Sequence, residues 1–305
     1  MIKRVCIVIN PAAGQDRPFL GIFNKFFNDA QIDWDICVTK KAGDGTRLAR
    51  QAVKDGYDAV ASFGGDGTVM EVANGLIGSQ VPLAILPGGT ANVMSFELGI
   101  PNTLEGALAL LNTEISTTRK VDMGQIGERH FLLRAGMGFE ADYVEQASRE
   151  LKDKIGSLAY GVAALNALRE PTISHYQLTL DGKEIENEGM TCFVANSGSL
   201  GQTGLSLAPS IDVSDGLLDV IVINKADLGS ILGVMRSVVT HNEDESVLQH
   251  WQAREINVVA DPPQSVQMDG EIIGQTPLHV KVIPEAVNII IPKPVSTPAE
   301  TPSVK

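Results

Sequence analysis

The sequence predicts a two-domain protein, with an α/β domain built on a parallel sheet followed by a mainly β domain. Three observations lead to this fold class. The chain has 305 residues, which is long for one compact core. Strand and helix patterns alternate through residues 1–125, as they do in a parallel sheet with helices on both faces. After about Val121 the pattern changes to strands joined by turns.

In the first domain the strands are apolar runs and the helices show 3.6-residue periods. Residues 5–9 are apolar throughout, which is typical of a strand buried on both faces. Pro18 stands where a helix would start, and the apolar residues after it follow i, i+3, i+4 spacing. The sequence then predicts strands over residues 32–38, 59–63 and 83–86, and helices around 48–53, 69–77, 91–98 and 103–111.

In the second domain, expected over residues 126–286, the signals are mainly those of strands. Asp181-Gly182 joins residues 177–180 to 183–185, and this dipeptide is typical of a two-residue hairpin turn. Further strands are predicted over residues 191–195, 217–223, 256–260, 265–268, 278–283 and 287–291, and helices over 142–169 and 228–240. The tail, residues 293–305, is rich in Pro, Ser and Thr and is predicted to be disordered.

Composition excludes several classes of function. A formal net charge of -13 argues against nucleic acid as a partner and against a polybasic membrane patch. No apolar stretch approaches the ~20 residues of a spanning helix, and the N-terminal apolar run is shorter than a signal peptide, so a soluble protein is expected. The three cysteines lack metal-ligand spacing, and their odd number suits a reducing cytosol.

Three glycine-rich loops follow predicted strands of the parallel sheet. Loops at the carboxyl ends of such strands share one edge, where ligands bind, and a following helix offers free N–H groups to an anion. The carboxylate of Asp66 could hold a magnesium ion or its waters. The loops are Asn10-Pro11-Ala12-Ala13-Gly14, Gly64-Gly65-Asp66-Gly67-Thr68 and Pro87-Gly88-Gly89-Thr90-Ala91-Asn92.

The residues alone leave alternatives open. A single glycine-rich loop is more often a turn than a phosphate site, and neither a P-loop nor a G-x-G-x-x-G motif is present. Glu271 follows an Asp-Gly turn and would ordinarily be an exposed hairpin acid. Asp212, Asp215 and Asp219 form either a solvated acidic loop or a metal loop. No Lys follows Gly14, so phosphate charge must be met by amides, magnesium and Arg17.

The run 64–68, followed by Glu71 and Asn74, resembles the nucleotide-binding signature of the diacylglycerol kinase catalytic family, and of its bacterial soluble diacylglycerol and lipid kinases in particular. The resemblance covers nearly the whole chain. It continues through Asn10-Pro11 to Gly14, Thr39 before Gly43-Asp44, residues 87–92, Ala208-Pro209, residues 215–219 and Asp269-Gly270-Glu271. Two departures are Val93, where many relatives carry Asp, and the glycine-rich stretch 196–209, which is not a close match.

This resemblance implies a phosphofructokinase- and NAD kinase-like α/β domain and a β-sandwich-like domain, with the site in the cleft between them and residues 287–292 returning to the first domain. ATP and Mg²⁺ are the implied cofactors. Glu271 and Asp66 are the implied catalytic residues, Glu271 as the general base. Asp215, with the backbone carbonyls of Asp212 and Leu217, resembles the family's structural magnesium site. The implied nucleotide residues are Asn10, Pro11, Ala12, Ala13, Gly14, Thr39, Gly64, Gly65, Asp66, Gly67, Thr68, Glu71, Gly89, Thr90 and Asn92.

The function that follows is transfer of the ATP γ-phosphoryl group to the hydroxyl of diacylglycerol or a similar lipid. The expected partners are a lipid with a free hydroxyl and, transiently, the membrane surface reached from the cytoplasm. A homodimer stays open. The alternatives are an NAD kinase-like enzyme, which shares the Gly-Gly-Asp-Gly-Thr element and the two-domain plan, and a nucleotide- or lipid-sensing module without turnover.

Overall fold

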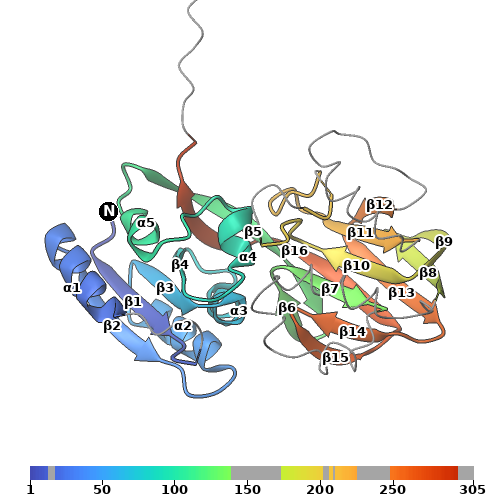
Figure 1. The fold of residues 1–305 in the computed structure, drawn as a ribbon, viewed down its shortest axis with the longest axis horizontal. Coiled ribbons are helices and arrows are strands. Elements are labelled where there is room, and N and C mark those ends of the chain that lie inside the picture. Colours follow the sequence, from blue (N-terminus) through green and yellow to red (C-terminus); the bar gives the residue numbers. More distant parts are fainter. Residues whose placement is uncertain (13–17, 139–172, 202–205, 209, 225–247, 295–305) are drawn as a thin grey trace, which may run out of the picture.

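A computed structural model of the chain describes residues 1–12, 18–138, 173–201, 206–208, 210–224 and 248–294. The helices expected over residues 142–169 and 228–240 lie outside these ranges, as do Ala13, Gly14, Arg17 and nearly all of the expected tail. The described residues form two lobes that lie side by side (Figure 1). No helix within these ranges is long and apolar enough to cross a membrane.

The N-terminal lobe is the expected α/β domain. Its four parallel strands lie in the order β2-β1-β3-β4. They are β1 (Arg4–Ile9), β2 (Asp33–Val38), β3 (Ala59–Gly64) and β4 (Leu83–Pro87), and the helices are α1 (Phe19–Ala30), α2 (Asp44–Lys54), α3 (Asp66–Leu76), α4 (Val93–Glu97) and α5 (Leu104–Ala109). Because α2 packs on α3 and α1 packs on α5, four of these five helices form two pairs beside the sheet.

One long strand, β16 (Leu278–Pro292), joins the two lobes. Its first half pairs with β13 (Glu255–Asp261) of the second lobe, and its second half lies parallel to β4. Strand β5 (Ser116–Ile126) pairs antiparallel with both halves. The sequence predicts two strands here, over residues 278–283 and 287–291, and this is wrong. Pro284 and Glu285, whose φ is 51°, form a bulge within one continuous strand. The sheet of the first lobe therefore extends into the second.

The second lobe is a sandwich of two sheets, as expected for the fold class. The first sheet extends past β16 through β13, β8 (Ser174–Leu180) and β9 (Lys183–Gly189). The second sheet has the order β12-β11-β10-β7-β14-β15, and all its pairs are antiparallel. Its strands are β12 (Leu248–Ala253), β11 (Leu218–Ile223), β10 (Thr191–Ala195), β7 (Arg134–Met137), β14 (Ser265–Met268) and β15 (Glu271–Gln275). The short β6 (Arg129–Phe131) pairs with β5.

Each lobe has its own hydrophobic core. The first lies between the parallel sheet and its helices, and includes Phe23, Phe27 and Leu76. The second lies between the two sheets of the sandwich, and includes Tyr176 and Phe131. Burial of these large side chains is the main stabilising contribution, at roughly 25 cal/mol for each Å² of apolar surface removed from water. Separate cores leave the boundary between the lobes free for polar loops.

Candidate active site

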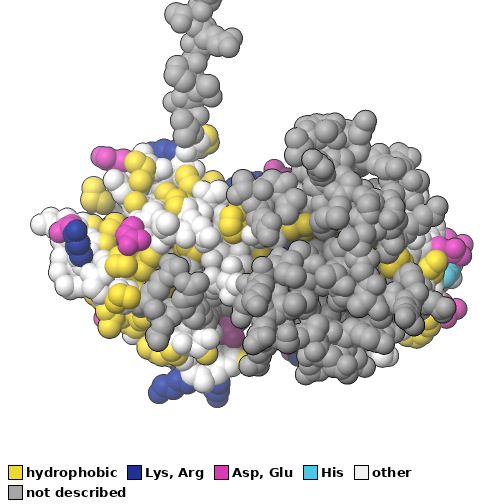
Figure 2. All heavy atoms as spheres, viewed as in Figure 1, with side chains coloured by type: hydrophobic (Ala, Val, Ile, Leu, Met, Phe, Trp, Pro, Cys, Tyr) yellow, Lys and Arg dark blue, Asp and Glu magenta, His cyan; other side chains and the backbone are white. Residues whose placement is uncertain are grey.

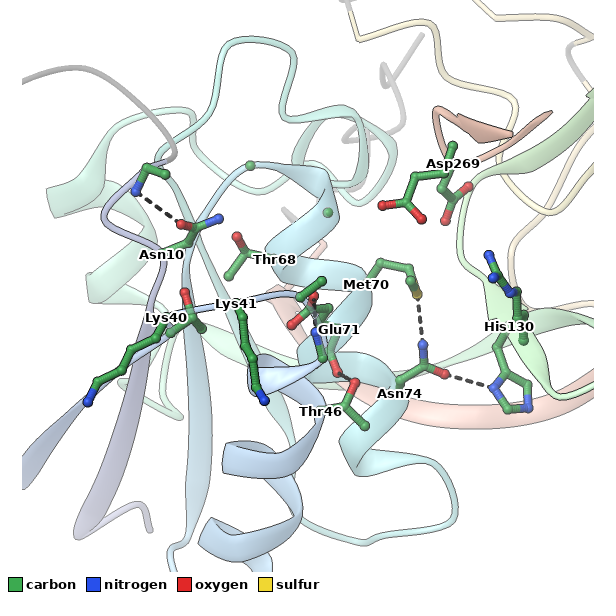
Figure 3. Close-up of a pocket in the computed structure, with 18 of the residues that line it drawn as sticks. Asn10, Lys40, Lys41, Thr46, Thr68, Met70, Glu71, Asn74, His130 and Asp269 are labelled. Atoms are coloured by element: carbon green, nitrogen blue, oxygen red, sulfur yellow. Dashed lines mark hydrogen bonds between the residues drawn. The ribbon is translucent and has the colours of Figure 1, made fainter. Parts of the chain in front are cut away.

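A cavity of about 1180 Å³ lies where the loops of the first lobe face the second lobe (Figure 3). One wall consists of the turn after β1, the loop after β2 and the first turns of α3. The opposite wall consists of the β14–β15 turn and the β5–β6 hairpin. The residues that line it include Asn10, Pro11, Ala12, Thr39, Lys40, Lys41, Gly65, Gly67, Thr68, Glu71, Asn74, Glu128, Arg129, His130, Asp269 and Glu271. Nine of the predicted site residues are therefore brought together.

The turn from β3 into α3 presents backbone N–H groups to this cavity. Gly67 is exposed, with nothing within 4 Å of where a Cβ would stand, so an incoming group can approach its backbone closely. Gly64 lies beneath the wall, and a Cβ there would be 2.4 Å from Thr68 Oγ1. Thr68 is buried, and its hydroxyl has no hydrogen-bond partner among the described residues. Free N–H groups and a free hydroxyl at a helix N-terminus are suited to an anion.

The turn after β1 contributes a second set of amides. Asn10 donates its backbone N–H to the Phe63 carbonyl at 3.2 Å, which ties the turn to the end of β3. The Asn10 side-chain oxygen accepts the Ala12 N–H at 3.0 Å and bends the chain beside the cavity. This turn therefore lies next to the first turn of α3, as the parallel-sheet argument predicts.

The loop after β4 lies against these turns but not on the cavity wall. Gly89, Thr90 and Asn92 are not among the described residues that line it. The Asn92 side chain is buried and closes its own loop, because it accepts the Gly89 N–H at 2.9 Å and donates to the Gly89 carbonyl at 3.0 Å. A Cβ on Gly89 would stand 2.5 Å from the Gly65 Cα, so the two glycine loops touch at backbone distance.

Asp66 also lies behind the cavity wall. Its Oδ1 accepts the Met94 N–H at 3.2 Å, so the carboxylate bonds to the first turn of α4. Burial raises the pKa of Asp66, and the amides of Val93 and Met94 partly offset this rise. The carboxylate therefore joins the second and third glycine loops, and its expected contact with a magnesium ion stays a prediction.

Glu71 shapes the loop after β2. Its two oxygens accept the N–H groups of Gly43 at 2.8 Å and Gly45 at 2.7 Å. The Thr46 hydroxyl donates to the Glu71 carbonyl oxygen at 2.8 Å. Both carboxylate oxygens thus hold the start of α2 against α3. Any contact of Glu71 with a nucleotide would then be indirect, through the loop that Glu71 positions.

The wall from the second lobe carries two carboxylates of different character. Asp269 is half-buried on the cavity wall, and its oxygens accept the N–H groups of Leu132, Leu133 and Arg134 at 3.1, 3.2 and 3.0 Å. Burial raises the pKa of Asp269 to about 6, although these amides and the Arg134 charge oppose the rise. Glu271 is exposed at the rim of the cavity, two residues further along the same turn. A carboxylate at that rim can reach a substrate held between the lobes.

Sequence reasoning missed the basic residues of the cavity. Lys40 and Lys41 follow Thr39, and Arg50 and Arg129 lie on α2 and β6. The dipeptide Lys40-Lys41, unusual in so acidic a chain, was a signal that could have found the first two. These cations can balance the charge of a bound phosphate, which the sequence analysis assigned to amides, magnesium and Arg17.

His130 spans the cavity between the lobes. Its Nδ1 lies 2.8 Å from the Asn74 side-chain oxygen on α3, and the Asn74 amide donates to the Met70 sulfur (Figure 3). Burial, together with the nearby Arg50 charge, lowers the pKa of His130. A neutral imidazole that donates its Nδ1–H to the Asn74 oxygen fits this geometry. His130 and Asn74 together therefore connect the two lobes at the cavity.

The predicted metal residues lie in the loop before β11, apart from the cavity lining. Asp212 accepts the Ser214 N–H at 2.9 Å and pairs with Arg119. Asp215 accepts the Leu217 N–H at 2.9 Å and a Gln252 amide N–H at 3.2 Å. No group of three or more His, Cys, Asp or Glu side chains suited to a metal ion occurs within the described ranges. The side chains do not by themselves form a magnesium site, and the one expected here stays a prediction.

Both lobes of the chain resemble known proteins. Residues 4–126 match the family model described as the diacylglycerol kinase catalytic domain, and residues 134–291 match the YegS C-terminal NAD kinase beta sandwich-like domain. Among curated relatives, the uncharacterized protein sll0036 of Synechocystis is 33% identical, with 94% of this chain and 70% of that protein covered. The diacylglycerol kinase of Bacillus subtilis is 28% identical, with 96% and 97% covered.

Solved structures agree with this comparison. One crystal structure from Bacillus anthracis str. Sterne aligns with a TM-score of 0.84 at 27% identity, and covers 96% of this chain and 98% of its own. Another from the same organism, described as that of a diacylglycerol kinase, aligns with a TM-score of 0.76 at 26% identity, with 97% and 99% covered. The similarity therefore extends over both lobes.

Proposed function

The chain belongs to the diacylglycerol kinase family, and we propose that it transfers the γ-phosphoryl group of magnesium–ATP to the hydroxyl of diacylglycerol or a similar lipid. One observation carries the proposal. A single cavity is lined on one side by turns suited to phosphate, around Asn10 and Gly67, and on the other by the carboxylate of Glu271. Phosphoryl transfer needs this combination of held phosphates and a carboxylate near the attacking hydroxyl.

In this proposal the first lobe binds the donor. The N–H groups at the start of α3 and beside Asn10 bind phosphate oxygens, and the Thr68 hydroxyl donates a further hydrogen bond. Lys40 and Lys41 lower the electrostatic cost of bringing a polyanion to a protein of net charge -13. Arranged in advance, such donors need little reorganisation during the reaction.

The second lobe activates the acceptor. Glu271 takes the proton of the lipid hydroxyl while that oxygen bonds to the γ-phosphorus. The bond from the γ-phosphorus to its bridging oxygen breaks, ADP leaves with the electron pair, and a phospholipid forms. An exposed carboxylate at the rim suits a base that must meet a substrate arriving from a membrane.

Approach to a lipid surface would depend on apolar contact. Ile272, next to Glu271, is 56% exposed. On the face shown in Figure 2, the described part of the N-terminal lobe exposes mostly uncharged and apolar side chains, with Lys and Arg in small separate groups. Such a surface lacks the dense positive charge that anchors proteins to anionic lipid, which supports transient contact through apolar residues at the rim.

The test is an assay with radiolabelled magnesium–ATP and mixed micelles of diacylglycerol, with identification of the phosphorylated lipid by mass spectrometry. Formation of phosphatidic acid is the expected result. Label on another lipid from a total extract would identify that lipid, and not diacylglycerol, as the acceptor. Label on NAD, in a parallel reaction, would replace the proposal by the NAD kinase-like activity. ATP binding without any labelled acceptor would favour the sensing module.

A substitution tests the role of Glu271. Glu271→Gln keeps the shape but removes the base, so kcat should fall by about 10²–10⁴-fold, the usual contribution of general base catalysis. ATP affinity should stay unchanged, because the phosphate-binding turns lie on the other lobe. Glu255→Gln, which changes an exposed acid of β13 paired with Lys281, is the matched control. Equal kcat in the Glu271 variant and the control would remove Glu271 from the reaction.

A further inference from the structure

Two thiols are in contact on neighbouring strands of the N-terminal lobe. The Cys6 thiol of β1 donates a hydrogen bond to the Cys37 sulfur of β2, and the two Sγ atoms are 3.4 Å apart. Both residues are free cysteines, separated by 31 positions in the chain. Because the S–S bond of a disulfide is about 2.05 Å long, the two sulfurs would have to approach each other by roughly 1.4 Å to form one.

The pair lies diagonally across the two strands. In their parallel register Cys6 is opposite Asp35 and Cys37 is opposite Val8, so the cysteines are offset by two residues on the same face of the sheet. With strands about 4.8 Å apart and a rise of about 3.3 Å per residue, diagonal Cα atoms are about 8 Å apart. A disulfide spans at most about 6.8 Å between Cα atoms, so bond formation must shift the backbone.

The shift falls on β2, because β2 is the edge strand of its sheet (Figure 1). Among the described strands it is hydrogen-bonded to β1 alone, whereas β1 is also held by β3. A disulfide that strains the backbone is more easily reduced again than an unstrained one. Ready reversal is a property of regulatory disulfides, not of structural ones.

Both strands lead directly into the cavity wall. Residues 10–12, after β1, and residues 38–43, after Cys37, all line the cavity. The Thr39 N–H donates to the Ile9 carbonyl at 2.9 Å, which joins the two segments where the strands end. A shift of β2 along β1 therefore moves the turns to which the proposed function assigns the phosphates.

The three cysteines differ in their access to solvent. Cys37 is half-buried on the edge strand, so a small oxidant can reach it. Cys6 is buried beneath it, and burial raises the pKa of the Cys6 thiol, which therefore keeps its proton. Cys192 is buried in the core of the second lobe, where a thiol packs as a small apolar side chain. Cys37 is thus the thiol that reacts first, with Cys6 beside it.

We propose that Cys6 and Cys37 form a reversible disulfide on oxidation by hydrogen peroxide, and that this bond weakens nucleotide binding in the cavity. The peroxide transfers one oxygen to the Cys37 sulfur, which gives a sulfenic acid and one water. The Cys6 sulfur then bonds to the Cys37 sulfur, the S–O bond breaks, and the hydroxide leaves as a second water with the Cys6 proton. The two thiols lose two electrons, and the peroxide gains them.

The disulfide can be tested without any activity. The reduced protein is treated with equimolar hydrogen peroxide, denatured and alkylated. Two of its three thiols should be lost, mass spectrometry should find Cys6 and Cys37 in one linked peptide, and dithiothreitol should restore both thiols. Cys37→Ser should give no linked peptide. Cys192→Ser is the matched control and should form the bond as the wild type does.

The effect on the cavity rests on the proposed function and has its own readouts. Oxidation should weaken calorimetric binding of magnesium–ADP about tenfold, which corresponds to the loss of about one hydrogen bond. Cys37→Ser should bind ADP equally before and after peroxide. Amide hydrogen exchange over residues 38–43 should become faster, because the shift would break the bond from Thr39 to Ile9. The exchange readout needs no nucleotide, so it judges the coupling even if ADP does not bind and the proposed function fails.

The inference has two separate points of failure. Peroxide treatment that leaves all three thiols free, or that links Cys192 instead, would show that Cys6 and Cys37 only pack together. A Cys6–Cys37 bond that leaves the affinity for ADP within threefold of that of the reduced protein would remove the regulatory role. In a protein that binds no ADP, unchanged exchange over residues 38–43 would have the same meaning.

Discussion

Substitution of Asp269 by Asn should change how the stability of the protein depends on pH. Asp269 is half-buried at the β14–β15 turn, where its oxygens accept three backbone N–H groups from residues 132–134. Its pKa is raised to about 6, mainly by burial, whereas an exposed Asp has a pKa of about 3.9. Asn has nearly the same shape but does not titrate, so the substitution isolates this one ionisation.

The direction follows from linkage. Because the pKa of Asp269 is higher in the folded state than in the unfolded one, the folded protein binds the proton more tightly. Protonation of Asp269 therefore stabilises the fold. This stabilisation is fully present below about pH 4 and is lost as the pH rises through about 6. At 1.36 kcal/mol for each pKa unit, the loss amounts to about 3 kcal/mol in the free energy of unfolding.

The assay is urea unfolding of wild type and Asp269→Asn at pH values from 4 to 7.5. The wild-type free energy of unfolding minus that of the variant should fall by about 3 kcal/mol across this range. Asp181→Asn is the control, since Asp181 also precedes a glycine in a hairpin turn and accepts the N–H groups of Arg254 and Glu255, but lies exposed. A wild-type-minus-Asp269→Asn difference that is constant between pH 4 and 7.5 would refute the reasoning.

Other predictions test the walls of the cavity. Gly89→Ala should lower the melting temperature, because its Cβ would stand 2.5 Å from the Gly65 backbone and such overpacking costs about 1–3 kcal/mol. Gly67→Ala has open space around its Cβ, so it should leave the melting temperature unchanged but raise the ATP KM about tenfold. Glu71→Gln should destabilise by about 1–3 kcal/mol in thermal unfolding, because its NH₂ would face a backbone N–H, and a melting temperature like that of wild type would contradict this. His130→Ala should raise the ATP KM up to about fivefold, through the loss of about 1 kcal/mol of hydrogen bonding, with kcat unchanged; an unchanged KM would show that the contact does not shape the cavity.

The first lobe was predictable because its strands are buried on both faces. Such strands are continuous apolar runs in the sequence, as in β1 and β3, and amphipathic helices separate them. The second lobe was harder. β15 (Glu271–Gln275) is largely exposed and has little apolar pattern, and β7 begins with Arg134 and contains a glycine, so neither was predicted. Both are strands because their neighbours in the sheet supply the hydrogen bonds, which local sequence does not reveal.

The candidate site also has features that could be predicted from the sequence and features that could not. Convergence of the loops after β1 and β3 follows from the parallel sheet, so the clustering of Asn10, Gly67 and Thr68 could be predicted from their positions in the chain. The direction in which each side chain points could not be predicted in this way. The carboxylate of Asp66 bonds to the N–H group of Met94 on α4, and that of Asp269 bonds to the N–H groups of residues 132–134. Contacts between residues so far apart in the chain depend on how the lobes meet.

The way the lobes meet bears on how the site could work. The turns proposed to bind phosphate belong to one lobe and Glu271 to the other, so their separation depends on the geometry of the boundary. β16 runs through both lobes in one sheet. Two further sets of hydrogen bonds cross the boundary: Glu97 accepts from Ser197 and Ser199, and His130 bonds to Asn74. A shared strand resists sliding and spreading more strongly than a flexible linker does, because displacement would break its ladder of backbone hydrogen bonds. The distance between phosphate and base is then set chiefly by the fold, which is the condition under which arranged donors and a fixed carboxylate are effective in catalysis.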